Sequence, residues 1–258
     1  MKKLMTVAAA ALCAAVGFGA DAIESANTVG FIKSAVLEKN SYTAMGVQFK
    51  VTGEAGSETP INNLLTVDVL RTGTKLGTSV DQIQIWDDES GLFKAYYYNK
   101  DLSGWCSEDD STKITTDTVK AGQGIFFRRA NYKDGSAVTM SGEVFTGDSV
   151  TYADLEKNSY TFMCYPWPVD FKIADMEKCI TVAPRSGTKL GTSVDQVLVW
   201  NDESGLFEAY YLKKEVGFVK DGEDDVTKDV IPAGTCFFFR RANYKDAGTV
   251  VFTKPAGL

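Results

Sequence analysis

The stretch RTGTKLGTSVDQIQIWDDESGLFKAYYY (Arg71–Tyr98) returns later in the chain as RSGTKLGTSVDQVLVWNDESGLFEAYYL (Arg185–Leu212), with about three quarters of its positions identical. In both copies two short runs rich in β-branched and aromatic residues flank an acidic turn, DDESG or NDESG. Gly91 or Gly205 lies where the turn needs a positive φ. The stretch therefore predicts a β-hairpin twice.

The repetition extends outward from this hairpin. LEKNSYT (Leu37–Thr43) recurs at Leu155–Thr161, and AGQGIFFRRANYKD (Ala121–Asp134) recurs as AGTCFFFRRANYKD (Ala233–Asp246). A period of roughly 115 residues is too long for a solenoid repeat and has the size of a small domain. We predict two tandem modules, residues 23–146 and 147–258.

Each module reads as all-β. SYTAMG or SYTFMC supplies a first strand, GIFFRR or CFFFRR follows a glycine turn, and AVTMSG or TVVFTK supplies a last strand. Between the first strand and the hairpin of each module, we expect a short helix or an irregular crossover, formed by INNLLTVDVL in the first copy and ADMEKCITV in the second. About five strands with frequent glycine turns predict a small β-sandwich or barrel-like module. The uninterrupted junction near Gly142 to Tyr152 predicts that the two modules touch through a fixed interface.

This order of motifs resembles a repeat module of secreted or surface proteins of environmental and gut bacteria, notably the Verrucomicrobia and Lentisphaerae group. The matching pieces are VGF at Val29, GW at Gly104, VKAGQGIFF at Val119 and SGEV at Ser141. The resemblance implies a location outside the cytoplasm and a β fold, and it assigns no catalytic residue. The second copy departs from it where Gly124 becomes Cys236.

The first 22 residues, MKKLMTVAAAALCAAVGFGADA, combine two lysines, a short apolar run and an A-x-A ending at Ala22. This pattern predicts a secretory signal peptide and no membrane insertion after its removal. The chain is acidic, with 27 Lys and Arg against 34 Asp and Glu, which argues against nucleic acid as a partner. We expect a secreted or cell-envelope protein whose partner is an extracellular protein or a polysaccharide.

The 258 residues include no histidine, which removes the Ser-His and Cys-His nucleophilic systems and histidine-ligated zinc. Acidic side chains at the hairpin tips remain as candidates: Asp87, Asp88, Glu89, Asp202 and Glu203. Neighbouring tip carboxylates diverge and are well solvated, so they do not suit a glycosidase acid and base, and we predict no enzyme. Calcium is a possible ligand of these tips and of SEDDST and DGEDD, although the spacing matches no EF-type loop. No other cofactor is expected.

Aromatic side chains suggest carbohydrate binding as the alternative function. Alternation along DQIQIW puts Ile83 and Ile85 on the core face and Trp86 on the other. The candidate ligand-binding residues are Trp86, Tyr96, Tyr98, Trp200 and Tyr210. In the first copy, Trp86, Tyr96 and Tyr98 are a candidate platform on one face, together with Gln82 and Gln84. Packing of Trp86 and Trp200 between sheets or between modules is the competing interpretation.

Two pairs of residues repeat at the end of the apolar strand, Arg128-Arg129 and Arg240-Arg241. Successive strand residues face opposite ways, so one arginine of each pair is expected to meet an acid such as Asp81 or Asp195 in a surface ion pair, and the other to be solvated.

Four cysteines lie beyond the predicted signal peptide. Alignment of the copies sets Cys164 opposite Gly46 and Cys236 opposite Gly124, which predicts that the two sites are neighbours and that a Cys164–Cys236 disulfide entered the second copy. Reduced core cysteines are the alternative. Cys179 is expected to be a buried thiol, and Cys106 either a second buried thiol or a weakly reactive one.

Together these features predict a secreted or envelope-associated protein with a structural or interaction role and no catalytic activity.

Overall fold

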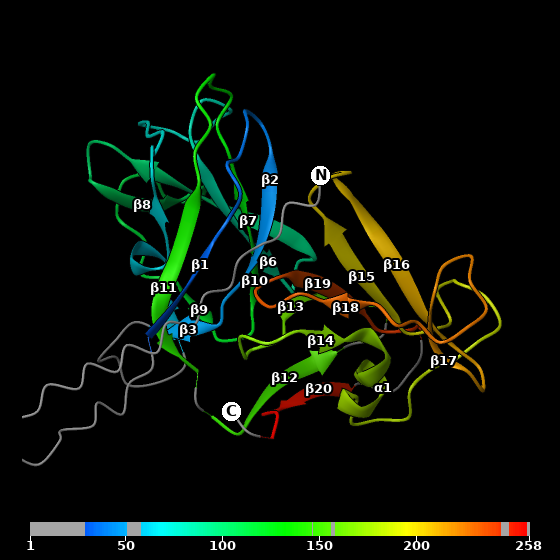
Figure 1. Cartoon of the computed structure of the whole chain (residues 1–258). Coiled ribbons are helices and arrows are strands. Elements are labelled where there is room, and N and C mark those ends of the chain that lie inside the picture. Colours follow the sequence, from blue (N-terminus) through cyan, green and yellow to red (C-terminus); the bar gives the residue numbers. More distant parts are fainter. Residues whose placement is uncertain (1–28, 51–57, 146, 156–157, 244–247, 257–258) are drawn as a thin grey trace, which may run out of the picture.

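The computed structural model describes residues 29–50, 58–145, 147–155, 158–243 and 248–256. The predicted all-β class is confirmed: these residues form several sheets, with antiparallel pairing in every ladder between described strands. The one α-helix among them, α1 (Met176–Cys179), is very short (Figure 1). The predicted signal peptide, residues 1–22, lies outside the described residues.

Residues 29–144, called the first half below, contain a five-stranded sheet. Its order is β2 (Tyr42–Gly46), β10 (Gly124–Arg128), β6 (Gln82–Asp87), β7 (Leu92–Asn99) and β8 (Gly104–Ser107). A second sheet has β11 (Val138–Val144) between β1 (Val29–Lys33) and β3 (Phe49–Lys50), with β5 (Thr66–Val67) also on β11. The short strands β4 (Glu58–Pro60) and β9 (Thr118–Lys120) pair separately.

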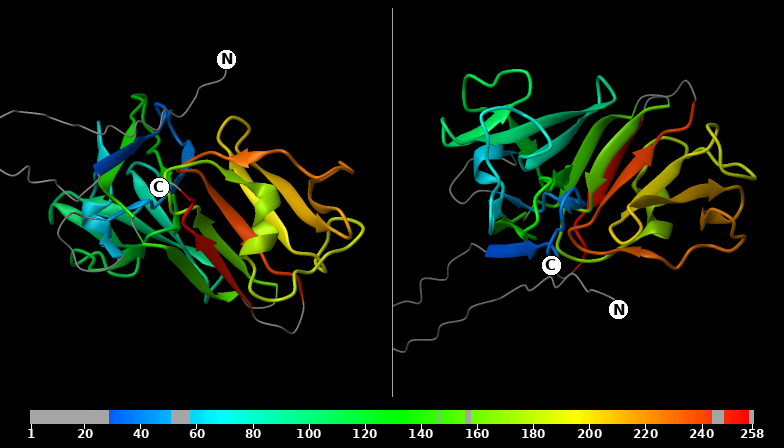
Figure 2. Two further views of the ribbon diagram at one scale, coloured as in Figure 1. Left: turned by 60° about the horizontal axis from the view of Figure 1, so that its bottom comes forward. Right: turned by 90° about the horizontal axis from the view of Figure 1, so that it is seen from above.

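Residues 149–256, called the second half, contain a five-stranded sheet of matching order. It runs β13 (Tyr160–Cys164), β19 (Cys236–Arg240), β15 (Gln196–Asn201), β16 (Leu206–Lys213) and β17 (Gly217–Lys220). Strand β12 (Ser149–Leu155) pairs with β20 (Gly248–Thr253), and β14 (Phe171–Lys172) pairs with β18 (Val230–Ile231). Figure 2 shows the two halves side by side from two further directions.

One face of each five-stranded sheet packs on the half's smaller sheet. In the first half Ile83, Ile125 and Phe127 meet Val138 and Met140 of β11. In the second half the β15 and β19 side chains meet Val250 and Phe252 of β20. The predicted core face, with Ile83 and Ile85 inward, is confirmed.

The repeated hairpins are β6–β7 and β15–β16, and their registers match residue for residue. Gly91 and Gly205 both have φ of +67°, a conformation in which a side chain is strained. The ambiguous crossover is a single 3-10 turn, Ile61–Asn63, in the first half. In the second half a similar turn, Ile173–Asp175, continues into α1.

A buried ion pair explains why Asp81 and Arg129 recur. Both side chains have no exposed surface, and Arg129 Nη1 lies 2.5 Å from Asp81 Oδ2. The Asp81 carboxylate also accepts the backbone N–H groups of Arg71 and Ala130, each at 2.8 Å. It thereby fixes the loop that precedes the hairpin to the end of β10.

The second half repeats this contact with Asp195 and Arg241, again at 2.5 Å and fully buried. The expected pairing is right, but the expected surface location is wrong. The second arginine of each pair is not solvated either: Arg128 and Arg240 are buried, and each lies over a tyrosine ring. The second arginines have partners that alternation along a strand does not predict, because Arg128 donates to the side chain of Asn40 and Arg240 donates to that of Asn158.

The other face of each five-stranded sheet packs against the opposite half. We call this contact the inter-half interface; its buried residues are Ala44, Phe126, Phe162, Cys164, Cys236 and Phe238. Two reciprocal backbone hydrogen bonds cross it, from Gly46 N–H to Gly234 O at 2.8 Å and from Cys164 N–H to Gly122 O at 2.7 Å. The two bonds join sequence-equivalent positions, so the halves are related by an approximate twofold arrangement.

The interface is sterically unequal. A Cβ atom on Gly46 would lie 2.5 Å from Cys164 Sγ, and one on Gly124 would lie 2.7 Å from a Phe162 ring carbon. Phe126 stacks on Phe162 with ring centroids 4.8 Å apart. The first half thus contributes small residues where the second half contributes large ones.

Candidate functional site

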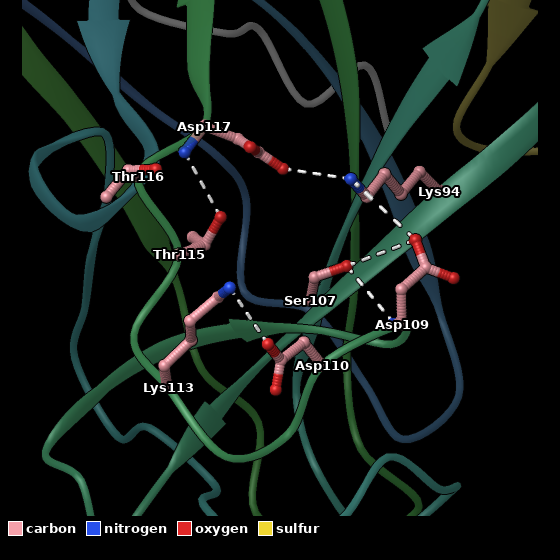
Figure 3. Close-up of a pocket in the computed structure, with 8 residues that line it drawn as sticks. All are labelled: Lys94, Ser107, Asp109, Asp110, Lys113, Thr115, Thr116 and Asp117. Carbon is pink, nitrogen blue, oxygen red and sulfur yellow. Dashed lines mark hydrogen bonds and ion pairs between the residues drawn. The ribbon is translucent and has the colours of Figure 1, made fainter.

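A polar hollow of about 210 Å³ lies in the first half beside β7 and β8 (Figure 3). Its lining residues are Lys94, Ser107, Asp109, Asp110, Lys113, Thr115, Thr116 and Asp117. Lys94 projects from β7 and Ser107 ends β8, while the others belong to the segment that connects β8 to β9. Carboxylate, ammonium and hydroxyl groups therefore meet over the end of one sheet edge.

Lys94 is held in place by three groups. Its Nζ lies 3.0 Å from Asp117 Oδ2 and 3.7 Å from Asp109 Oδ2, and 5.5 Å from the centre of the Tyr96 ring. The hydrogen bond to Asp117 raises the pKa of Lys94. The hydroxyl of buried Tyr96 donates to Asp117 at 2.7 Å, and this bond is the main cause of a lowered Asp117 pKa. The pair is charged at neutral pH.

The opposite wall carries a second ion pair. Lys113 Nζ lies 3.0 Å from Asp110 Oδ2. The Asp110 carboxylate also accepts the Thr112 hydroxyl, and this bond is the main reason that its pKa falls to about 2. Ser107, which is buried, accepts the Asp109 N–H through its hydroxyl at 3.2 Å. Each ammonium of the hollow thus has a carboxylate partner.

The equivalent place in the second half carries different charges. The strand registers match Lys94 with Glu208 and Ser107 with Lys220. Lys220 Nζ contacts Glu208 Oε2 directly at 2.9 Å, and the Tyr210 hydroxyl donates to Asp229 at 2.8 Å. The second half keeps the tyrosine–aspartate contact and replaces the two groups that face the hollow.

The predicted aromatic residues do not form one platform. Trp86 pairs with Phe93 across the hairpin, whereas Tyr96 and Tyr98 belong to the opposite, core-facing set. Tyr96 is 3% exposed and Tyr210 is 2% exposed, and Tyr98 packs edge-on against Trp105 at 5.8 Å. The expectation that Trp86, Tyr96 and Tyr98 share a face is wrong, because register assigns alternate faces.

Trp86 and Trp200 lie at the inter-half interface. Trp86 Nε1 donates to Tyr160 O at 2.8 Å, and its ring meets Phe238 of the second half at 5.0 Å. The Trp200 ring meets Phe126 of the first half at 5.2 Å. Both indoles remain partly exposed. The competing interpretation, packing between modules, describes their position, and ligand binding by them stays a prediction.

The acidic hairpin tips also reach across the interface. Asp202 accepts the Thr43 hydroxyl at 3.4 Å, and the equivalent Asp88 accepts that of Thr161. Although both residues are exposed overall, their carboxyls face the other half, and the loss of solvent there raises their pKa, to about 6 for Asp88.

The remaining tip acids stay at the turns. Asp87 accepts the N–H of Glu89, and the N–H of Glu203 bonds to Asn201. Among the described residues no group of three or more acidic or cysteine side chains is arranged to hold a metal ion. Calcium at Asp87, Asp88, Glu89, Asp202 or Glu203 stays a prediction. In the SEDDST segment, Lys94 stands between Asp109 and Asp117, where a cation would be repelled.

Cys164 and Cys236 are direct cross-strand neighbours on β13 and β19, and both are fully buried. The predicted adjacency is confirmed, but both are free thiols, so the predicted bond is not present. Cys106 is a buried free thiol, one of its two expected states. Cys179 is half-buried rather than buried, and loss of solvent raises its pKa to about 11.

The hollow itself was missed from the sequence. SEDDST signalled acidic residues there, but neither Lys94 nor Asp117 carries a motif. Lys94 lies over the segment that follows β8 because β7 and β8 pair, and this pairing is not visible in a local motif. A comparison of the repeats could have flagged the Lys94-to-Glu208 exchange.

Comparison of the chain with protein-family models, curated proteins and solved structures finds no match. Within the described residues no helix is long and apolar enough to cross a membrane.

Proposed function

We propose that the protein is a secreted or envelope-associated structural or interaction protein, built from a duplicated β module and without catalytic activity. Residues 1–22 act as its signal peptide, and residues 23–146 and 147–258 are the two copies. The motifs that resemble the repeat module of Verrucomicrobia and Lentisphaerae surface proteins support this location. An extracellular protein or polysaccharide is its partner.

One observation carries the proposal: the repeated residues are used in scaffold contacts. Asp81 with Arg129 and Asp195 with Arg241 make the same buried contact in both halves. Gln82 and Gln196 both donate to a glycine carbonyl of the preceding loop. A duplicated active site would instead keep its exposed polar groups, and the groups around Lys94 and Glu208 differ.

The inter-half interface supports a mechanical role. Its rings pack at centroid distances of 4.6 to 6.5 Å, and backbone hydrogen bonds cross it at two equivalent places. Two modules joined in this way keep a fixed orientation, which suits a component of a surface layer, matrix or adhesive assembly.

In an oxidising compartment we expect Cys164 and Cys236 to be joined. Cys164 N–H bonds to Gly122 O of the first half, so the pair occupies a non-hydrogen-bonded site, where cross-strand Cα atoms lie about 4.5 Å apart. That spacing is within the range of disulfides. Exchange with an envelope disulfide donor takes two electrons and two protons from the thiols and reduces the donor to a dithiol.

Cell fractionation tests the location. In bacteria that produce the full chain, the protein should be found in the envelope or medium and begin at Ile23 by mass spectrometry. A cytoplasmic protein that retains residues 1–22 would contradict the proposal.

The alternative function is carbohydrate binding through the Trp86 and Trp200 faces, which the interface leaves partly exposed. Polysaccharide pull-down separates the two functions. Selective binding that Trp86→Ala abolishes, while circular dichroism shows that the variant is still folded, would favour the alternative.

A further inference from the structure

We propose that the polar hollow beside Lys94 binds one uncharged sugar ring. This site is separate from the Trp and Tyr residues considered above. If the protein binds a polysaccharide, as proposed above, this hollow is where one ring of that polysaccharide binds. The inference rests on the proposed function for the biological role of the site.

The charges around the hollow disfavour ions of either sign. A metal cation entering it would meet the ammonium groups of Lys94 and Lys113. An anion would meet the carboxylates of Asp109, Asp110 and Asp117. The two ammonium groups offset two of the three carboxylates and leave a single net negative charge, so the ligand that we infer carries no net charge.

The hydrogen-bonding groups suit neighbouring hydroxyls. A carboxylate only accepts, an ammonium only donates, and a sugar hydroxyl does both. In Figure 3 these groups alternate around the hollow, with the Ser107 and Thr115 hydroxyls between the two ion pairs. One hydroxyl of a ring can donate to Asp109 while its neighbour accepts from Lys94.

The key groups are held before any ligand arrives. Lys94 is fixed by Asp117 and the Tyr96 ring, and Asp117 is fixed by the buried Tyr96 hydroxyl. Ordering long side chains is a main cost of binding, and this cost is reduced for Lys94 and Asp117.

The size of the hollow limits the ligand. Its volume of about 210 Å³ is below the roughly 300–1,000 Å³ of pockets that enclose drug-sized molecules. It therefore holds a single ring of a longer chain, and affinity for an isolated monosaccharide should be low, with a Kd of about 1 mM.

The second half provides the control. There Glu208 replaces Lys94 and Lys220 replaces Ser107, so the two positions that supply the ammonium donor and the hydroxyl of the hollow have different chemistry. Binding is expected in the first half alone.

Amide NMR titration of the mature chain with glucose, galactose, mannose and N-acetylglucosamine tests the proposal. With at least one sugar, saturable shifts should be confined to Lys94 and residues 107–117. Asp109→Ala and Lys94→Met should each weaken binding at least tenfold. Asp224→Ala, at a fully exposed acid of the second half, should leave it unchanged. Melting curves would identify a variant that fails to fold; Asp109 is exposed, so its variant should fold normally.

Shifts with none of the four sugars would overturn the inference, as would shifts centred on residues 208–229. Saturable shifts of the same amides with calcium chloride or sodium phosphate would also overturn it, because they would identify an ion site. None of these results would change the location measured by fractionation, so the two proposals fail separately.

Discussion

Between the two halves, the residues that hold the loop before each hairpin are the same, whereas the residues that line the hollow beside the first hairpin differ. Asp81 and Arg129 reappear as Asp195 and Arg241 with the same 2.5 Å contact, whereas Lys94 and Ser107 become Glu208 and Lys220. A buried charge tolerates no change of one partner, whereas a partly exposed position such as Lys94 can take a different charge when its neighbours change with it. The difference separates the residues that build the fold from those free to acquire a ligand.

The largest expected effect comes from breaking the shared contact. Asp81→Asn should lower the free energy of unfolding by about 3–5 kcal/mol, because it leaves the buried Arg129 charge uncompensated. Asp195→Asn should cost the same amount in the second half. Urea unfolding measures both, with Asp134→Asn, at an exposed ion pair, as a control expected to change stability by less than about 1 kcal/mol. If all three variants lost the same small amount of unfolding free energy, the buried ion pairs would not have the stabilising role assigned to them.

The two small sites of the first half, Gly46 and Gly124, are Cys164 and Cys236 in the second, and this contrast predicts a redox effect. The oxidised protein should be up to about 4 kcal/mol more stable than the reduced protein, because the bond closes a loop of roughly 70 residues in the unfolded chain. Peptide mapping without reduction identifies the bond. Urea unfolding with and without a reductant measures its effect, and Cys236→Ser should abolish the difference. A protein from the envelope with Cys164 free would falsify the bond.

The hairpin tips should respond alike in the two halves. Gly91→Val and Gly205→Val should each cost about 1–3 kcal/mol, since both glycines have φ of +67°. Gly77→Val, at a position where a Cβ meets nothing within 4 Å and φ is not positive, is the matched control. Thermal melting distinguishes strain from a mere increase in side-chain size. A tip variant as stable as the control would show that the turn relaxes.

The smallest effect concerns the tip carboxyls at the inter-half interface. Because folding raises the pKa of Asp88 to about 6 from its ordinary value near 4, its protonated form is favoured in the folded state, so stability falls as the pH rises through this range. The effect should be no more than about 1 kcal/mol for each carboxyl, since both residues are exposed overall.

Folding lowers the pKa of other carboxyls, such as Asp117 and Glu208, so they make the protein more stable as the pH rises. The effect of Asp88 and Asp202 is therefore measured as the difference in stability between the wild type and a variant that lacks both carboxyls. The double variant Asp88→Asn, Asp202→Asn should be as stable as the wild type near pH 4 and slightly more stable above pH 6. A stability gap that is constant with pH, or a wild-type melting temperature that rises steeply with calcium, would indicate a different role for these acids.

Local patterns predicted the hairpins well. Turn chemistry placed Gly91 and Gly205, and period-2 alternation placed Ile83 and Ile85 in the core. Alignment of the repeats was informative for one long-range feature, the adjacency of Cys164 and Cys236, because paired changes report a shared neighbourhood.

Prediction failed where the answer depends on elements distant in sequence. The face of Trp86 was assigned correctly as the non-core face, but the second half that covers it could not be derived from alternation. The prediction put Tyr96 on the same face as Trp86, whereas the hairpin register pairs Tyr96 with Ile83 on the core face. The burial of Arg128 depends on the path of a loop, for which the sequence has no periodic signal.

The unequal sizes across the inter-half interface make it selective for unlike faces. Two first-half faces brought together would set Ala44, Gly46 and Gly124 against one another and leave voids, whereas two second-half faces would force Phe162 and Cys164 into the same space. Only a first-half face opposite a second-half face is complementary. Separated halves mixed in solution should therefore form mixed pairs in preference to like pairs, and covalent linkage ensures that each face has its complement at hand during folding.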